Sequence, residues 1–202
     1  MTDKIIVFTD GSCLNNGKKN SIGAIGIFFS DEDPDNLGQV IDNDGIKITN
    51  NTMELLSCIQ ALKIIDDKIL NGKIEAKIIY IYTDSTYIIN AITKWYSGWV
   101  KNGWLTSKGK EVENKELINL LYNLKSKYIV IFKHIRSHQN EPKNKNTDLY
   151  NIWYGNYMAD KYATESSKQF LKDNFKKSDT NEINITVKKT NIKKKFTNSL
   201  NI

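Results

Sequence analysis

The stretch Lys77-Ile78-Ile79-Tyr80-Ile81-Tyr82-Thr83-Asp84-Ser85 decides the fold. Its continuous apolar run predicts a central β-strand that is covered on both faces. An acid follows the run directly, and either Asp84 or Ser85 can cap a helix that we expect to continue to about Thr93. A buried strand that passes through a polar turn into a helix is typical of an α/β protein.

The regions on either side extend this pattern. A short apolar run over 5–8 ends in a predicted Asp10-Gly11-Ser12 turn, and residues 136–150 form a long polar loop. We expect strands over 5–8, 21–29, 38–41, 77–83 and 128–134, and helices over 52–70, 85–93, 114–124 and 154–171. This order predicts an α/β fold, a mixed five-stranded sheet flanked by helices.

Length and composition suit a soluble globular protein. The 202 residues fit one domain of about 150 residues with an extension, and 40% hydrophobic residues are ordinary for a globular protein. No apolar stretch is long enough to span a membrane, and the N-terminus lacks the features of a signal peptide. Only Cys13 and Cys58 are present, too few for a disulfide framework. We therefore expect an intracellular, cytoplasmic protein without a membrane partner.

Positive charge is concentrated at the C-terminal end. The net charge is +6, and residues 165–202 contain nine Lys against four acids. We predict a catalytic domain over 1–171 and a basic, flexible extension over 172–202. A basic extension favours a polyanionic partner, and Lys193-Lys194-Lys195 is a candidate nuclear signal. The alternative is compositional bias, because Lys, Asn and Ile are abundant throughout.

Four acids carry most of the chemistry: Asp10, Glu54, Asp84 and Asp160. Each lies at the end of a predicted element, and the neighbouring apolar runs would draw these ends together. Gathered carboxylates repel one another, so the group must take up a proton or bind a cation. Carboxylate ligands favour Mg2+ or Mn2+, and a pair of such ions promotes in-line cleavage of phosphodiesters. The alternatives are an Asp-Gly turn, a helix N-terminal charge, a helix cap and a solvated helix acid, respectively.

The motifs around these acids resemble type 1 ribonuclease H. Asp-Gly-Ser, Asn-Asn-x-Met-Glu-Leu, Thr-Asp-Ser and Gly-Asn-x-x-Ala-Asp occur in the family's order, over about residues 4–168. The resemblance implies an endonuclease that cuts the RNA strand of RNA–DNA hybrids and leaves 5′-phosphate and 3′-hydroxyl ends. It also implies two Mg2+ ions held by the four acids, with Mn2+ as a substitute, and we expect a monomer.

The resemblance implies further site residues. His138 matches the auxiliary histidine that transfers a proton, whereas His134 ends a strand and is expected to be structural. The loop after His138 is longer than in compact bacterial members, so the sequence does not fix the pose of His138. Candidate nucleic-acid contacts are Ser12, Cys13, Asn16, Thr49, Asn50, Asn51, Lys101, Trp104 and Asn114.

Several alternatives stay open at this point. The Asn residues are also suited to loops and caps, and Trp95 and Trp99 are expected to lie in the core, with Trp104 more exposed. Another nuclease of the same fold, such as a junction resolvase, is the main enzyme alternative. A catalytically dead hybrid-binding module would lack at least one acid. Met1 and the long extension argue against a domain cut from a reverse transcriptase.

A second acidic stretch imitates a calcium site. Asp31, Asp33 and Asp35 have the spacing that begins an EF-hand loop. The glycine that such a loop needs is replaced by Asn36, and Pro34 interrupts it. We therefore expect no calcium there.

Overall fold

The computed structural model describes residues 4–42, 45–75 and 78–179, with side chains to 174, and divides the chain into two compact units, 1–171 and 172–202. The strands are β1 (Lys4–Leu14), β2 (Ile22–Phe28), β3 (Leu37–Ile41), β4 (Ile78–Thr83) and β5 (Ile129–His134). The helices are α1 (Asn50–Leu70), α2 (Thr86–Asn90), the π-helix η1 (Ala91–Trp95), α3 (Tyr96–Lys101), α4 (Lys115–Lys125) and α5 (Asp148–Asp179).

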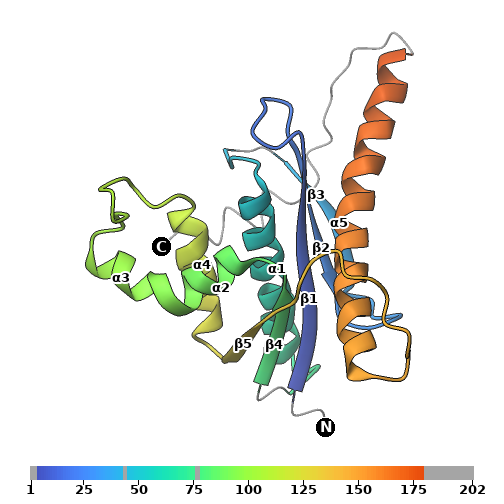
Figure 1. Ribbon diagram of the computed structural model, residues 1–202, viewed down its shortest axis with the longest axis horizontal. Coiled ribbons are helices and arrows are strands. Elements are labelled where there is room, and N and C mark those ends of the chain that lie inside the picture. The colour runs from blue at the N-terminus through green and yellow to red at the C-terminus, as the bar shows by residue number, and fades with distance from the viewer. Residues whose placement is uncertain (1–3, 43–44, 76–77, 180–202) are drawn as a thin grey trace. The chain divides into compact units, whose positions relative to one another are not determined.

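The five strands form one mixed sheet in the order β3-β2-β1-β4-β5 (Figure 1). β2 is antiparallel to both β1 and β3, whereas β4 is parallel to both β1 and β5. The mixed five-stranded sheet predicted from the sequence is thereby confirmed. Phe8 of β1 pairs with Tyr82 of β4, so the carboxyl ends of these two parallel strands lie at the same edge of the sheet.

Helices cover both faces of the sheet, with α1 on one face and α5 on the other (Figure 1). A Cβ added at Gly11 or Gly23 would collide with Met53 of α1. A Cβ added at Gly26 would instead collide with the backbone of α5 at Ala159. Glycines on opposite faces of β1 and β2 therefore let both helices approach the strands closely.

The core lies mainly between the sheet and α1, whose Met53, Leu55, Ile59 and Ile65 are fully buried. Burial along β4 alternates: Ile79 and Ile81 are buried, whereas Tyr80 between them is only half-buried. The strand is central, as predicted, but one face is covered more completely than the other. No helix in the described part of the chain is both long enough and apolar enough to cross a membrane.

The predicted turn at Asp10-Gly11-Ser12 is wrong. β1 continues through these residues to Leu14, because Phe8 to Leu14 pairs with Phe28 to Ile22 of β2. Asp-Gly is a local turn signal, and here the backbone hydrogen bonds to a neighbouring strand override it.

Two helices also differ from the predicted ranges. The helix after Ser85 ends at Asn90 and continues through η1 into α3, so the Trp-rich stretch is helical to Lys101. α5 begins at Asp148 rather than at residue 154, because the Thr147 hydroxyl accepts a hydrogen bond from Tyr150 N at 3.2 Å. It ends at Asp179, which places the first residues of the predicted extension in this helix.

Candidate active site

Two of the four acids lie at the edge of the sheet where β1 and β4 end. Asp10 continues β1 two residues beyond the Phe8–Tyr82 pair, and Asp84 follows the end of β4 at Thr83. The backbone N–H of Gly11 donates a 2.7 Å hydrogen bond to Asp10 Oδ1, which orients this carboxylate. Parallel pairing thus brings together two acids that lie 74 positions apart in the chain.

The other two acids come from the helices on opposite faces. Glu54 lies near the start of α1, where Gly11 allows the helix backbone to approach β1. The Ser85 hydroxyl, which also caps α2, is near enough to Glu54 to lower the pKa of this carboxyl. Asp160 follows Ala159, the α5 residue that packs against Gly26. Close packing of each helix therefore places its acid beside the strand ends.

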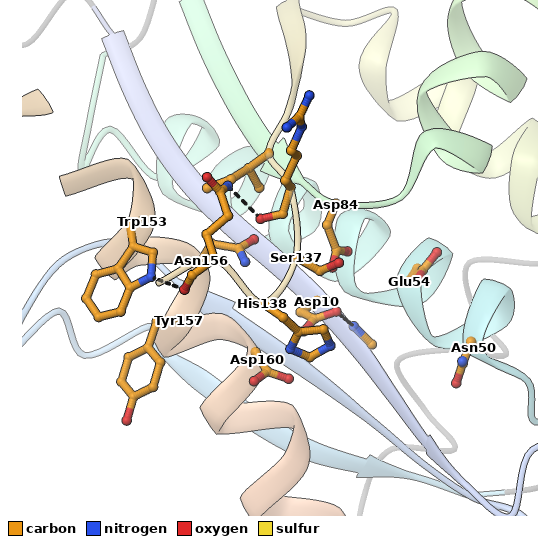
Figure 2. A pocket seen from close by; sticks show the side chains of 14 residues that line it. Asp10, Asn50, Glu54, Asp84, Ser137, His138, Trp153, Asn156, Tyr157 and Asp160 are labelled. Atoms are coloured by element: carbon orange, nitrogen blue, oxygen red, sulfur yellow. Dashed lines mark hydrogen bonds between the residues drawn. The ribbon is translucent and has the colours of Figure 1, made fainter. Parts of the chain in front are cut away.

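All five predicted catalytic residues line one pocket of about 250 Å³ (Figure 2). Figure 2 shows Asp10, Glu54, Asp84 and Asp160 around this space, with the His138 ring on the same side as Asp10 and Asp160. The full lining is Asp10, Gly11, Asn50, Glu54, Asp84, Ile135, Arg136, Ser137, His138, Gln139, Trp153, Asn156, Tyr157 and Asp160.

Burial and the repulsion between like charges both disfavour ionised carboxylates in the pocket. Burial raises the pKa of Asp10 well above its usual value, and the negative charges of Asp84, Asp160 and Glu54 raise it further. Burial also raises the pKa of Glu54, and the nearby Ser85 hydroxyl partly offsets this rise. The site therefore favours either a proton or a cation among its carboxylates.

The pKa of Asp84 is also shifted by burial and by neighbouring groups. Burial raises it, Asp160 raises it further, and the charges of His138 and His134 lower it. His138 is exposed on the turn after β5 and adopts a left-handed φ of +52°. His134 ends β5 opposite Thr83 and does not line the pocket.

The carboxylates share a pocket without forming a finished coordination sphere. Within residues 4–42, 45–75 and 78–179, no three His, Cys, Asp or Glu side chains are placed closely enough to hold a metal ion. The chemistry of the donors nevertheless fits a hard divalent cation, because four carboxylates line the pocket against one Arg and one His. Like charges repel, so a cation is needed to draw these oxygens into one sphere.

The predicted nucleic-acid contacts around α1 include residues that also stabilise local structure. Asn50 lines the pocket, and Asn51 beside it is exposed. Thr49 caps α1, because its hydroxyl accepts a 3.1 Å hydrogen bond from Thr52 N. The Thr52 hydroxyl donates in turn to Asn114 Oδ1 at 3.3 Å, and this links the start of α1 to the start of α4.

Ser12 and Cys13 lie on opposite faces of β1. The Ser12 hydroxyl is 3.3 Å from the hydroxyl of Ser167 on α5, whereas Cys13 Sγ donates to Asn16 Oδ1 at 3.7 Å. Strand alternation therefore separates Ser12 from the Cys13 and Asn16 pair. The latter pair is at the end of the strand and accessible to solvent.

The expected exposure of the tryptophans is wrong. Trp95 is 40% exposed, and no residue of α3, which carries Trp99, is buried. Trp104 is instead half-buried, with its ring edge-on to Tyr96 at 5.6 Å and Lys115 Nζ 5.9 Å from the ring centre. η1 buries Ala91 and Ile92 but not Trp95, so helical spacing alone did not indicate burial. Lys101, at the end of α3, is exposed.

Of the pocket residues on α5, sequence reasoning missed three: Trp153, Asn156 and Tyr157. They precede Asp160 by seven, four and three positions on α5. Residues at these spacings share a helix face, so a helix predicted to begin six residues earlier would have identified Trp153.

Comparisons with known proteins agree with this geometry. The family model described as RNase H matches residues 2–168. A Ribonuclease H of Rickettsia akari is 33% identical over 82% of this chain and 91% of its own length. Human Ribonuclease H1 is 33% identical over 84% of this chain, which spans only 52% of that protein. The crystal structure of LC9-RNase H1, described as a type 1 RNase H with the type 2 active-site motif, superimposes with a TM-score of 0.59 at 23% identity, covering 84% of this chain and 74% of the other.

Proposed function

Because the chain belongs to the ribonuclease H family, we propose that it is an endonuclease that hydrolyses the RNA strand of RNA–DNA hybrids. The observation that carries this proposal is the convergence of Asp10, Glu54, Asp84 and Asp160 on one pocket. These acids come from two strand ends and two helices, so their meeting depends on the whole fold. The products would carry 5′-phosphate and 3′-hydroxyl ends.

We propose that the four acids hold two Mg2+ ions, which Mn2+ can replace. The raised pKa of Asp10 supports a cation site, because the neighbouring carboxylates disfavour its ionised form in the absence of positive charge. When bound, such ions activate water and stabilise the leaving 3′ oxygen of the RNA.

The chain's own residues orient and move protons around this centre. The Gly11 N–H donates to Asp10 and gives this carboxylate a defined orientation, while the Ser85 hydroxyl favours the ionised form of Glu54. His138 lies near Asp84 on an exposed turn, where it can accept a proton from water or deliver one to the leaving oxygen.

Substrate recognition would use the polar groups beside the pocket. Asn50 and Asn51 at the start of α1, with Cys13 and Asn16 at the end of β1, are suited to the 2′-hydroxyls of RNA. Asn114, which is linked through Thr52 to the start of α1, would join them at the 2′-hydroxyls. Thr49 would face a DNA phosphate, and Lys101 and Trp104 would contact the hybrid further along. A single chain supplies all of these groups, which supports action as a monomer.

The test is cleavage of one sequence prepared as RNA–DNA hybrid, duplex RNA and duplex DNA, each with Mg2+, Mn2+ or chelator. We expect cleavage of the RNA strand of the hybrid only, and only with metal. Cleavage of branched duplex DNA in place of the hybrid would instead identify a junction resolvase. Tight binding of the hybrid without cleavage would identify a binding module.

A further inference from the structure

The turn that carries His138 has little support of its own. It spans Arg136 to Gln139, all four residues are exposed, and His138 adopts a φ of +52°. One hydrogen bond closes the turn, from Gln139 Nε2 to Arg136 O at 2.8 Å. A short exposed turn with one internal bond samples several conformations unless another element holds it.

Trp153 of α5 provides an external contact to this turn. Its indole Nε1 donates a 2.9 Å hydrogen bond to the backbone oxygen of Gln139, the residue that follows His138 (Figure 2). The bond crosses from the helix that carries Asp160 to the turn that carries His138. Trp153, which itself lines the pocket, therefore links the helix of Asp160 to the turn of His138.

The indole itself is held on the helix by its neighbours. Tyr157 stacks on it, with ring centres 5.4 Å apart and planes within 11°, and Tyr150 lies 5.6 Å away on the preceding turn. Tyr150 also stacks on Tyr154, with ring centres 5.9 Å apart. Rings packed along one helix face restrict the rotamers of Trp153, so its N–H has a defined direction.

We propose that Trp153 is a positioning residue that holds the His138 turn at the pocket through its hydrogen bond to Gln139. This inference rests on the proposed function, because it requires His138 to act in cleavage. The indole restricts the turn from outside and leaves the imidazole free to face the acids. The long loop between Gln139 and Trp153 closes back on itself at this bond.

The direct test is Trp153→Phe, which keeps an aromatic ring in the stack and removes only the N–H donor. We expect kcat for hybrid cleavage to fall about 3- to 10-fold, the effect of one net hydrogen bond. KM should stay within about twofold, because the turn would act on the chemical step rather than on binding. The melting temperature should be unchanged.

Tyr154→Phe is the matched control, because it removes one hydrogen bond from the adjacent residue of the same helix. That bond joins α5 to Asp31, and Tyr154 does not line the pocket. We expect its kcat to equal that of the unsubstituted chain. Gln139→Ala removes the bond that closes the turn from inside and should lower kcat in the same direction as Trp153→Phe.

The decisive measurement is Trp153→Phe in a His138→Ala background. If the indole acts through His138, its loss should have no further effect on kcat there. An equal loss in both backgrounds, or a raised KM in place of a lowered kcat, would show that Trp153 contacts substrate or supports α5, and would overturn the inference. An unchanged kcat for Trp153→Phe would overturn it too, while hybrid cleavage by the unsubstituted chain leaves the proposed function standing. No hybrid cleavage by that chain would overturn both.

Discussion

Acidic residues occur in two contrasting settings in this protein. In the pocket, Asp10 and Asp84 face other carboxylates, and burial with like charge raises the pKa of both. On the far part of α1, Asp66 accepts hydrogen bonds from Lys127 and from the Tyr128 hydroxyl. Burial alone would raise the pKa of Asp66, but these two donors outweigh it and hold the pKa below its usual value. Opposite shifts of the same chemical group thus separate a site from a structural anchor.

The acidic stretch that imitates a calcium loop belongs to the second setting. Asp33 and Asp35 contact Lys68 Nζ at 3.5 Å and 2.6 Å, and Lys68 also lies 5.0 Å from the centre of the Phe29 ring. The ammonium group occupies the position that a cation would need. These acids therefore join the β2–β3 connection to α1, whereas the acids of the pocket meet no Lys.

Asp10→Asn should have the largest effect: it should abolish hybrid cleavage and at the same time stabilise the fold. We expect hybrid cleavage to be abolished, because the substitution removes a metal-binding charge with little change in shape. We also expect a higher melting temperature in chelator. A carboxyl whose folded pKa is raised loses stability as pH rises through that pKa, so at neutral pH the neutral amide is the better residue. Cleavage assays in Mg2+ and thermal melts in chelator measure the two effects. Normal turnover, or a lowered melting temperature, would show that Asp10 has a structural role like that of Asp66 and is no metal ligand.

His138→Ala should lower kcat by about 10- to 100-fold, at or below the usual range for one proton-transfer group. Activity should survive, since the acids would still hold the metal ions. His134→Ala is the matched control, because His134 also lowers the pKa of Asp84 but does not line the pocket. Complete inactivity of a well-folded His138→Ala variant would mean that His138 is a ligand or a structural residue.

Asp66→Asn should test the structural setting. The partners are partly exposed, so we expect a loss of about 1–2 kcal/mol in the free energy of unfolding. The melting temperature should fall by about 2–4 °C for each kcal/mol lost in a domain of this size.

The stabilisation by Asp66 should also depend on pH. Because the folded pKa of Asp66 is lowered, this stabilisation is present above the unfolded pKa, near 4, and is lost as pH falls below that value. Thermal melts at neutral and acidic pH should show this, with kcat unchanged and with Asp67→Asn on the exposed side of α1 as control. A stabilised Asp66→Asn variant would show that Asp66 does not stabilise the fold and so does not differ from the pocket acids in this respect.

Removal of residues 180–202 should have the smallest effect on cleavage. This segment lies outside the described residues, and its sequence contains five Lys against one acid. If two or three of these Lys meet phosphates, the log–log salt slope of hybrid binding should fall by roughly 2, with kcat unchanged. A full-length variant with these five Lys changed to Gln should match the truncation. Coinciding salt slopes for the full and truncated chains would favour compositional bias as the origin of these Lys.

Local sequence patterns predicted best those helices and strands whose formation depends on residues nearby in the sequence. The apolar run before Asp84 and the helical spacing of Leu55, Ile59 and Leu62 correctly predicted β4 and α1. The turn at Gly11 was predicted wrongly, because backbone pairing with β2 overrides the local preference. The start of α5 was predicted too late, because the Thr147 cap lies within a polar stretch that resembles a loop.

The sequence by itself determined the chemistry of this protein: four acids and a histidine, in an order and spacing that belong to one family. The residue types alone predict oxygen ligands and a proton-transfer group. Only the tertiary structure decided which acids face one another and which are paired with Lys, and it alone revealed the bond between Trp153 and Gln139. These relations join residues on different elements, and their distances depend on how strands pair and helices pack rather than on any local pattern.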